Sequence, residues 1–299
     1  MKWEDRGQSR NVTDNRGRRS SGRGGGVGGM ASLGVGGFLI VLVLSLVSGV
    51  DLFGLLGIQS PLQGGATPTQ TQSSSAGTPG DQQMVSFVSA VLDDSQATWA
   101  AIFRENNIAY REAQLSLESG NVPSACGTVP ASAGPFYCPL DETVYLNFAF
   151  FNDLQNRYGA SGDFAQAYVI AHEMGHHVQN LLGTSDEVRQ QQQANPRQAN
   201  RLSVALELQA DCYAGIWGGE QTQAKSQQAG DQIESISQAD FEEGITAAAA
   251  IGDDRLQAQA TGRVNPEAFT HGSSEQRVQW FSQGFKSGNP SQCDTFASL

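Results

Sequence analysis

Two histidines one helical turn apart are the strongest chemical signal in the chain. The stretch from His172 to His176 reads HEMGH, and it lies in residues 163–182, whose apolar spacing predicts a helix. Residues four apart share one helix face, so the two imidazoles can converge on one ion while Glu173 reaches a water beside it. The competing interpretation is a pair of structural histidines, in the core or on the surface.

A catalytic zinc ion takes three protein ligands and leaves one position open. The third ligand must come from another part of the chain, and Glu207 is our candidate. Glu207 and Asp211 lie four residues apart in the otherwise apolar helix expected over residues 196–217. Asp211 can accept a hydrogen bond from a ligating histidine and so fix its tautomer. A solvated helix face or a capping ion pair is the alternative for both carboxylates.

The remaining elements must position these side chains, and they predict an α+β domain that is mostly helical with a small β-sheet. Apolar periodicity and capping residues predict helices over residues 84–106, 148–158, 237–250 and 273–285, and a short strand over residues 142–147. Gly, Pro and Ser punctuation predicts a loop at 119–142, and the polar, Gln-rich residues 184–194 predict a surface loop.

The amino-terminal quarter has a different composition. Residues 1–23 hold seven Lys/Arg against three Asp/Glu, and no charged residue occurs from Gly24 to Val50. Such a stretch is long enough to span a bilayer, and the positive-inside bias places the basic residues in the cytoplasm. A cleaved signal peptide and a buried core helix are the alternatives. We therefore expect the following division: a basic cytoplasmic tail at 1–23, a transmembrane anchor and flank at 24–58, a flexible Gly/Ser/Thr/Pro/Gln linker at 59–83 and the folded domain at 84–299.

Charge and cysteine content narrow the compartment and the partners. The chain has 18 Lys/Arg and 30 Asp/Glu, a formal charge of −12, which argues against a nucleic-acid partner. All four cysteines lie in the part expected outside the cytoplasm, where an even number predicts two disulfides. Three pairings are open; we prefer Cys126 with Cys138, because they flank one loop, which leaves Cys212 with Cys293. Buried free thiols are the alternative.

Four segments together resemble the bacterial neutral zinc metallopeptidase family: HEMGHHVQ, ELQADCYAG, GPFYCPLDETVYLN and THGSSEQRVQWF. The resemblance covers nearly the whole chain, including the apolar amino-terminal stretch. It places the chain among the HExxH zincins whose third ligand is a glutamate. The resemblance implies one catalytic Zn²⁺ held by His172, His176 and Glu207, with Glu173 as the catalytic base and Asp211 supporting the site.

The function implied by the resemblance is a membrane-anchored, extracytoplasmic peptidase, periplasmic or extracellular, that acts on a peptide or protein through a zinc-activated water. Residues 144–146 resemble the cleft-edge strand that pairs with extended substrate in zincins. His271 is a candidate for stabilising the oxyanion, with helix capping or core packing as the alternative. Two other functions stay open: a non-catalytic or gated interaction module of the cell envelope, and a hydrolase of non-peptide amides. The oligomeric state is not readable from the sequence.

Three further polar positions are expected to be structural. His177 must point about 100° away from the face that carries the metal ligands. Tyr213 lies in an apolar segment and is expected to pack in the core. The run of Asp253, Asp254 and Arg255 can bind a cation, but an ion pair at a helix end is the ordinary role for such a cluster.

Overall fold

A computed structural model describes residues 1–17, 79–130, 134–222 and 232–297. Its α-helices are α3 (Pro79–Glu105), α4 (Phe148–Asn156), α5 (Asp163–Leu182), α6 (Thr184–Ala194), α7 (Ala199–Glu220), α8 (Gln238–Ala250), α9 (Asp253–Thr261) and α10 (Ser274–Ser287). Short 3₁₀ turns are η2 (Pro196–Gln198), η3 (Pro266–Ala268) and η4 (Pro290–Gln292). The strands are β1 (Lys2–Trp3), β2 (Val12–Asp14), β3 (Gln114–Leu117), β4 (Val122–Ser124), β5 (Gly127–Val129), β6 (Phe136–Cys138), β7 (Thr143–Leu146) and β8 (Ile233–Ser235). The predicted helix-rich α+β class is confirmed.

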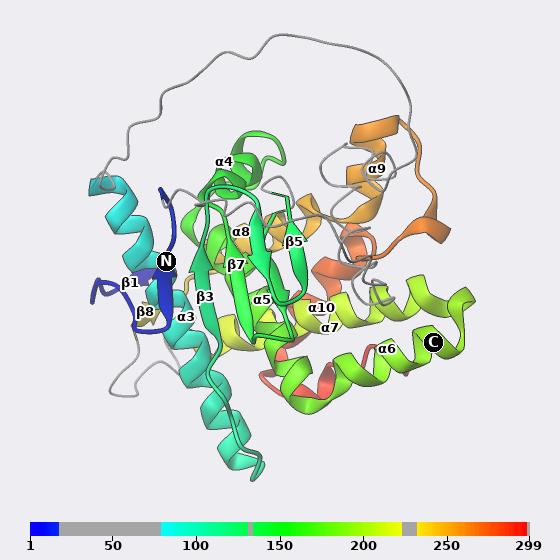
Figure 1. The fold of residues 1–299 in the computed structure, drawn as a ribbon, viewed down its shortest axis with the longest axis horizontal. Helices are drawn as coiled ribbons and strands as arrows, with labels where there is room; N and C mark the ends of the chain where they lie inside the picture. The colour runs from blue at the N-terminus through cyan, green and yellow to red at the C-terminus, as the bar shows by residue number, and fades with distance from the viewer. Residues whose placement is uncertain (18–78, 131–133, 223–231, 298–299) are drawn as a thin grey trace, which may run out of the picture.

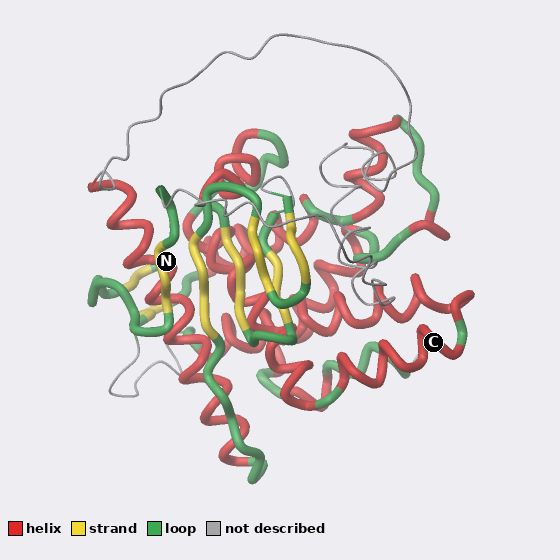
Figure 2. Tube along the Cα trace, viewed as in Figure 1, coloured by secondary structure: helices red, strands yellow, loops and turns green. Residues whose placement is uncertain are grey.

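The main sheet has four strands in the order β2-β3-β7-β6 and lies in front of the long helices (Figures 1 and 2). β2, β3 and β7 are parallel, whereas β6 runs antiparallel to β7. Leu115 on β3 lies opposite Val144 on β7, and both side chains are buried in the core shared with α5. Because β7 is paired on both sides, residues 144–146 cannot add a substrate strand. The edge strand next to α5 is β6, so the expectation for residues 144–146 is wrong.

Helix α7 packs closely on α10. A Cβ added to Gly215 would lie 2.1 Å from the Phe281 carbonyl oxygen, and one added to Gly219 would lie 2.3 Å from the Phe285 carbonyl oxygen. Only residues without a side chain allow this approach. The helix therefore continues through these glycines to Glu220, beyond the end at residue 217 that the sequence predicted.

Two segments predicted as loops contain regular structure. Residues 184–194 form α6, which has Asp186 and Glu187 in its first turn and buries Val188 and Gln192. Polarity suggested a loop, but Gln, Glu and Arg are good helix formers, and two buried side chains are enough to fix the helix on its neighbours. The segment 119–142 contains the β4–β5 hairpin and β6. The short apolar strand β6 was hidden among loop-forming residues.

Residues 1–17 are part of the folded domain and do not form the separate tail expected from the sequence. β1 pairs with β8, and β2 pairs with β3 at one edge of the main sheet. The Met1 ammonium lies 3.1 Å from Asp163 Oδ1 and 2.6 Å from Asp240 Oδ1. Helix α3 begins at Pro79, inside the expected 59–83 linker, so the domain also starts earlier on that side.

The basic residues of the amino terminus explain why the sequence suggested a tail. In the sequence alone, these residues resemble the positive charges that flank a transmembrane segment. In the structure, three of them form ion pairs with carboxylates. Arg10 pairs with Glu112 at 2.9 Å, and Arg16 pairs with Asp14 at 2.8 Å. Arg6 pairs with Glu4 in the same way. Pairing of this kind is invisible to a count of charges.

The expected transmembrane stretch at 24–58 lies outside the described residues. Within the part of the chain that is described, no helix is both long and apolar enough to cross a membrane. Both preferred disulfides are present, Cys126–Cys138 and Cys212–Cys293, so the free-thiol alternative is wrong.

Candidate metal centre

Helix α5 presents His172 and His176 from one face, as the four-residue spacing predicted. His172 is 7% exposed, and its ring centroid lies 4.8 Å from that of His176. Gly175, between them, allows the approach of α7, because an added Cβ would lie 2.9 Å from the Ala210 carbonyl oxygen. The one glycine of the motif thus lets the two helices that carry the site come into contact.

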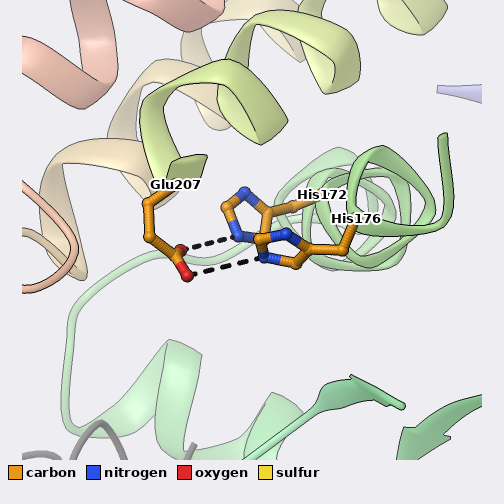
Figure 3. Close-up of side chains that lie close together, drawn as sticks. All are labelled: His172, His176 and Glu207. Atoms are coloured by element: carbon orange, nitrogen blue, oxygen red, sulfur yellow. Dashed lines mark hydrogen bonds and ion pairs between the residues drawn. The ribbon is translucent and has the colours of Figure 1, made fainter. Parts of the chain in front are cut away.

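Helix α7 supplies the third donor from Glu207. Its Oε2 lies 3.1 Å from His172 Nε2, and its Oε1 lies 3.6 Å from His176 Nε2 (Figure 3). One donor atom from each of the three residues lies within 4.8 Å of the others. Two imidazole nitrogens and a carboxylate oxygen match the donor set of a catalytic zinc ion that leaves one position open. The residues therefore fit Zn²⁺, and the grouping predicted from the sequence is present.

Asp211 lies directly behind His172. Its Oδ1 accepts from His172 Nδ1 at 2.9 Å, so Nε2 is left to face Glu207. Asp211 is fully buried and also accepts from Tyr168 and from Arg277, whose Nε and Nη2 atoms lie 2.8 and 2.9 Å from its two oxygens. The sequence indicated Asp211 but not Arg277, which lies 66 residues away in the chain.

Charge at the centre depends on these contacts. Burial lowers the pKa of His172, but Asp211 outweighs burial and raises it to about 10. Burial raises the pKa of Glu207, but the histidines outweigh burial and hold it well below its ordinary value. The two shifts favour opposite charges on His172 and Glu207, a protonated imidazole beside a carboxylate. A bound ion would displace that proton, because a ligating histidine is neutral.

His176 is supported by neutral amides. Its Nδ1 lies 2.8 Å from Gln179 Oε1, and Gln179 Nε2 donates to the Leu206 carbonyl at 2.6 Å and to Gln209 Oε1 at 3.1 Å. Gln209 Nε2 in turn donates to the Cys293 carbonyl at 3.1 Å. Sequence reasoning missed this chain of amides. The available signal was that Gln179 follows His176 by three residues, and so lies on the same side of α5.

Glu173 lines the same cavity as the three donors and is 8% exposed. Burial raises its pKa above the ordinary value of 4.5, and the positive charge of His176 and His172 offsets only part of this effect. A carboxylate whose pKa is shifted toward neutrality suits the role of a general base.

His271 also lines the cavity, although it is distant from α5 in the sequence. Its Nδ1 lies 3.0 Å from Asp253 Oδ1, while Asp253 Oδ2 accepts from the backbone amides of Thr270, His271 and Gly272. Burial lowers the pKa of His271, but Asp253 and the charge of Glu207 outweigh it and raise the pKa. Both oxygens of Asp253 are therefore occupied by the imidazole of His271 and by backbone amides, which orients His271 and leaves no carboxylate oxygen for a metal ion. Asp253 also begins α9, whereas the sequence suggested that it follows a helix end.

The two other positions expected to be structural are structural. His177 is fully buried, with Nδ1 2.9 Å from the Tyr137 hydroxyl and Nε2 2.7 Å from the Arg111 carbonyl oxygen. Tyr213 packs edge-on against Trp99, with ring centroids 5.0 Å apart. Neither residue lines the cavity.

The cavity beside the three donors has a volume of about 290 Å³. Its walls come from β6 and the residues before it, from α4 to α7, from α9 and α10, and from the segment around His271. Apolar side chains form most of the wall away from the donors, which is the usual character of a small-ligand or peptide pocket.

Comparison with known proteins agrees with this centre. A family model described as putative neutral zinc metallopeptidase matches residues 1–296, and the chain belongs to that family. The uncharacterized protein YpfJ of Escherichia coli K12 is 44% identical over 300 residues, which covers 99% of each chain. The uncharacterized protein Rv2575 of Mycobacterium tuberculosis is 46% identical over 191 residues, 63% of this chain and 64% of the relative. No solved structure matches the chain significantly.

Proposed function

We propose that this protein is a zinc-dependent peptidase that hydrolyses peptide bonds in a peptide or protein substrate. The observation that carries the proposal is the convergence of His172, His176 and Glu207 at one point of an apolar cavity that Glu173 also lines. Membership of the zinc metallopeptidase family supports it. Zn²⁺ held by these residues would supply a Lewis acid that polarises the scissile carbonyl and makes water nucleophilic at neutral pH.

The side chains of this chain divide the remaining work. Glu173 takes the proton of the attacking water as the carbon–oxygen bond forms, and it then passes that proton to the amine as the carbon–nitrogen bond breaks. His271, oriented by its contact with Asp253, donates a hydrogen bond to the oxygen on which negative charge develops. Asp211 and Gln179 hold the two ligand imidazoles in the tautomer that turns Nε2 toward the site.

The substrate backbone is proposed to lie along β6. This strand pairs with β7 on one side, and among the described strands none pairs on its other side. Phe136 and Tyr137 of β6 line the cavity. An extended peptide that adds to this edge gains backbone hydrogen bonds with little demand on its sequence.

The proposed location is extracytoplasmic. Two disulfides support it, because such bonds persist in oxidising compartments. The apolar stretch at 24–58 remains the proposed point of membrane attachment. Residues 1–17 pack on the domain. We therefore do not propose an anchor that crosses the membrane once, with residues 1–23 in the cytoplasm and the domain outside.

The test uses the full chain, its Glu173→Gln variant and a fluorescently labelled casein substrate. We expect near-stoichiometric zinc in both proteins, chelator-sensitive cleavage by the wild type, and a loss of about 10²–10⁴-fold in the variant, the usual contribution of a general base. Full activity in Glu173→Gln contradicts the assignment of the base. Zinc binding without cleavage by the wild type would favour the interaction module, and cleavage only of non-peptide amides would favour the other hydrolase.

A further inference from the structure

Apolar side chains from several elements line the cavity beside the metal centre. Val169 lies one helical turn before His172 on α5, and Ile251, which follows α8, also lines the cavity. Beyond His176, α6 follows the end of α5 and contributes Val188, which lines the cavity together with Leu206 of α7. A peptide bound in the cavity therefore meets apolar side chains of α5, α6 and α7.

The cavity offers no spare negative charge for a basic group. Among the described lining residues, the carboxylates are Glu173 and Glu207, and both belong to the metal centre. A lysine side chain, an arginine side chain or a free α-amino group would enter without a counter-charge. Burial of an unpaired charge costs several kcal/mol, so such groups are disfavoured here.

The cavity also lacks a strong site for a carboxylate. The basic side chains that line the cavity in the described chain, apart from the ligand histidines, are Arg189, His271 and Arg277. Arg277 donates to both oxygens of Asp211, and His271 is held by Asp253. Arg189 pairs with Asp186 at 2.8 Å in a solvent-exposed position, which is a weak interaction. Arg189 is therefore the one group that the experiment must test as a receptor for a terminal carboxylate.

We propose that the protein is an endopeptidase that cleaves beside bulky apolar residues and does not depend on either terminus of the substrate. This inference rests on the proposed peptidase function. A cavity of about 290 Å³ is at the lower end of ligand pockets, so it holds a few side chains of an extended segment. Large apolar residues are mostly buried in folded proteins, so the substrate class is the exposed apolar segment of an unfolded polypeptide.

The experiment compares internally quenched peptides that differ only at the two residues flanking the scissile bond. One set carries Leu and Phe at these two positions, and the other sets carry Lys, Glu or Gly. Each peptide is made in two forms, one with free ends and one with an acetylated amino end and an amidated carboxyl end. With the full-length, zinc-loaded protein we expect kcat/KM about 10–100-fold higher for the apolar set, the discrimination that an apolar pocket gives. Blocked ends should leave kcat/KM unchanged. The rate measured with Glu173→Gln is the background that is subtracted from each of these rates.

Two pairs of proteins locate the preference in the cavity. Leu206→Glu places a carboxylate in the apolar wall and should shift the preference toward Lys, whereas Leu182→Glu, at a residue 41% exposed and outside the cavity, should not. Zinc content is measured for both, because Leu206 adjoins Glu207. Arg189→Gln should keep the wild-type ratio of kcat/KM between peptides with free and with blocked ends.

The outcomes separate the two proposals. Preference for charged residues, dependence on a free end, or a loss in Arg189→Gln that is confined to peptides with a free carboxylate would overturn the inference while leaving the peptidase function standing. If the wild type cleaves no peptide faster than Glu173→Gln does, both fail. A disulfide-bonded protein is also offered as substrate, once in its native form and once unfolded by reduction and alkylation. Equal rates of cleavage for the two forms would overturn the assignment to unfolded polypeptide.

Discussion

The two ligand histidines share a helix and a motif, but their supports differ in charge. Behind His172 lies an ionic network, in which Asp211 joins the imidazole to the buried Arg277 on α10. Behind His176 lies a chain of neutral amides, from Gln179 through Gln209 to the segment held by the Cys212–Cys293 disulfide. One support depends on burying opposite charges together, the other on side-chain amides of fixed direction. Substitutions in the two supports should therefore differ in how much they lower the unfolding free energy and the zinc affinity.

The largest effect is expected from Asp211→Asn. The substitution keeps the size of the side chain but leaves Arg277 buried without its counter-charge, which costs about 3–5 kcal/mol of unfolding free energy. The loss of a carboxylate behind a ligand histidine should also weaken zinc binding, by about 10–100-fold. Denaturant unfolding and chelator competition measure the two effects.

A double variant separates stability from metal binding in this network. Asp211→Asn with Arg277→Met removes the orphaned charge and should recover much of the unfolding free energy, because replacing a whole buried pair is far less costly than breaking it. Zinc affinity should stay low, since His172 still lacks its carboxylate. Recovery of both properties together would mean that Asp211 acts on the fold alone.

His271 gives a third case, a histidine with a carboxylate but no arginine, and Asp253→Asn tests it. Burial raises the pKa of Asp253, but the hydrogen bonds from His271 and the backbone outweigh it, so the pKa is below its ordinary value of 3.8. A lowered pKa means that the carboxylate stabilises the fold above about pH 3.8 and that this contribution is lost as the pH falls through the folded-state pKa.

We therefore expect Asp253→Asn to lose about 1.5–3 kcal/mol at neutral pH, the value of hydrogen bonds to a charged group. The gap between variant and wild type should shrink in acid. Unfolding curves at several pH values measure this, and a gap that is constant down to pH 2 would contradict the ionic role of Asp253.

The smallest effects belong to the amide chain. Gln179→Met has a similar length but no acceptor for His176 Nδ1, and we expect zinc affinity to fall about 10-fold, with a stability loss of about 1 kcal/mol. Gln209→Met, one step further from the ligand, should weaken zinc binding less. If Gln179→Met proves as costly in stability as Asp211→Asn, the contrast between ionic and neutral support is wrong.

The ligands were predictable from the sequence because their geometry is local. A four-residue spacing fixes His172 and His176 on one helix face, and carboxylates in an apolar helix need partners, which singled out Glu207 and Asp211. The groups that hold the ligands were not predictable. Arg277 and Gln209 are ordinary residues whose role depends on which helices pack together, and no spacing along the chain encodes that packing.

The fold was predictable to a similar degree. The long helices were confirmed, and the last of them begins with a capping box at Ser273. Strand β6 was missed because three residues carry too little alternation to be seen, and β7 was then taken for the edge strand. Helix α6 was missed because its two buried side chains are separated by polar residues that resemble a loop.

The place of β2 at the edge of the main sheet has a practical consequence for anyone handling this protein. A fragment begun at α3 would lack β1 and β2, and β3 would show a row of unpaired backbone groups, which is a template for aggregation. By the same reasoning, a single proteolytic cut between residues 17 and 79 would not remove a dispensable leader. It would convert the chain into a two-piece, non-covalent complex whose amino-terminal piece stays bound through β2 as a strand of the sheet until the protein unfolds.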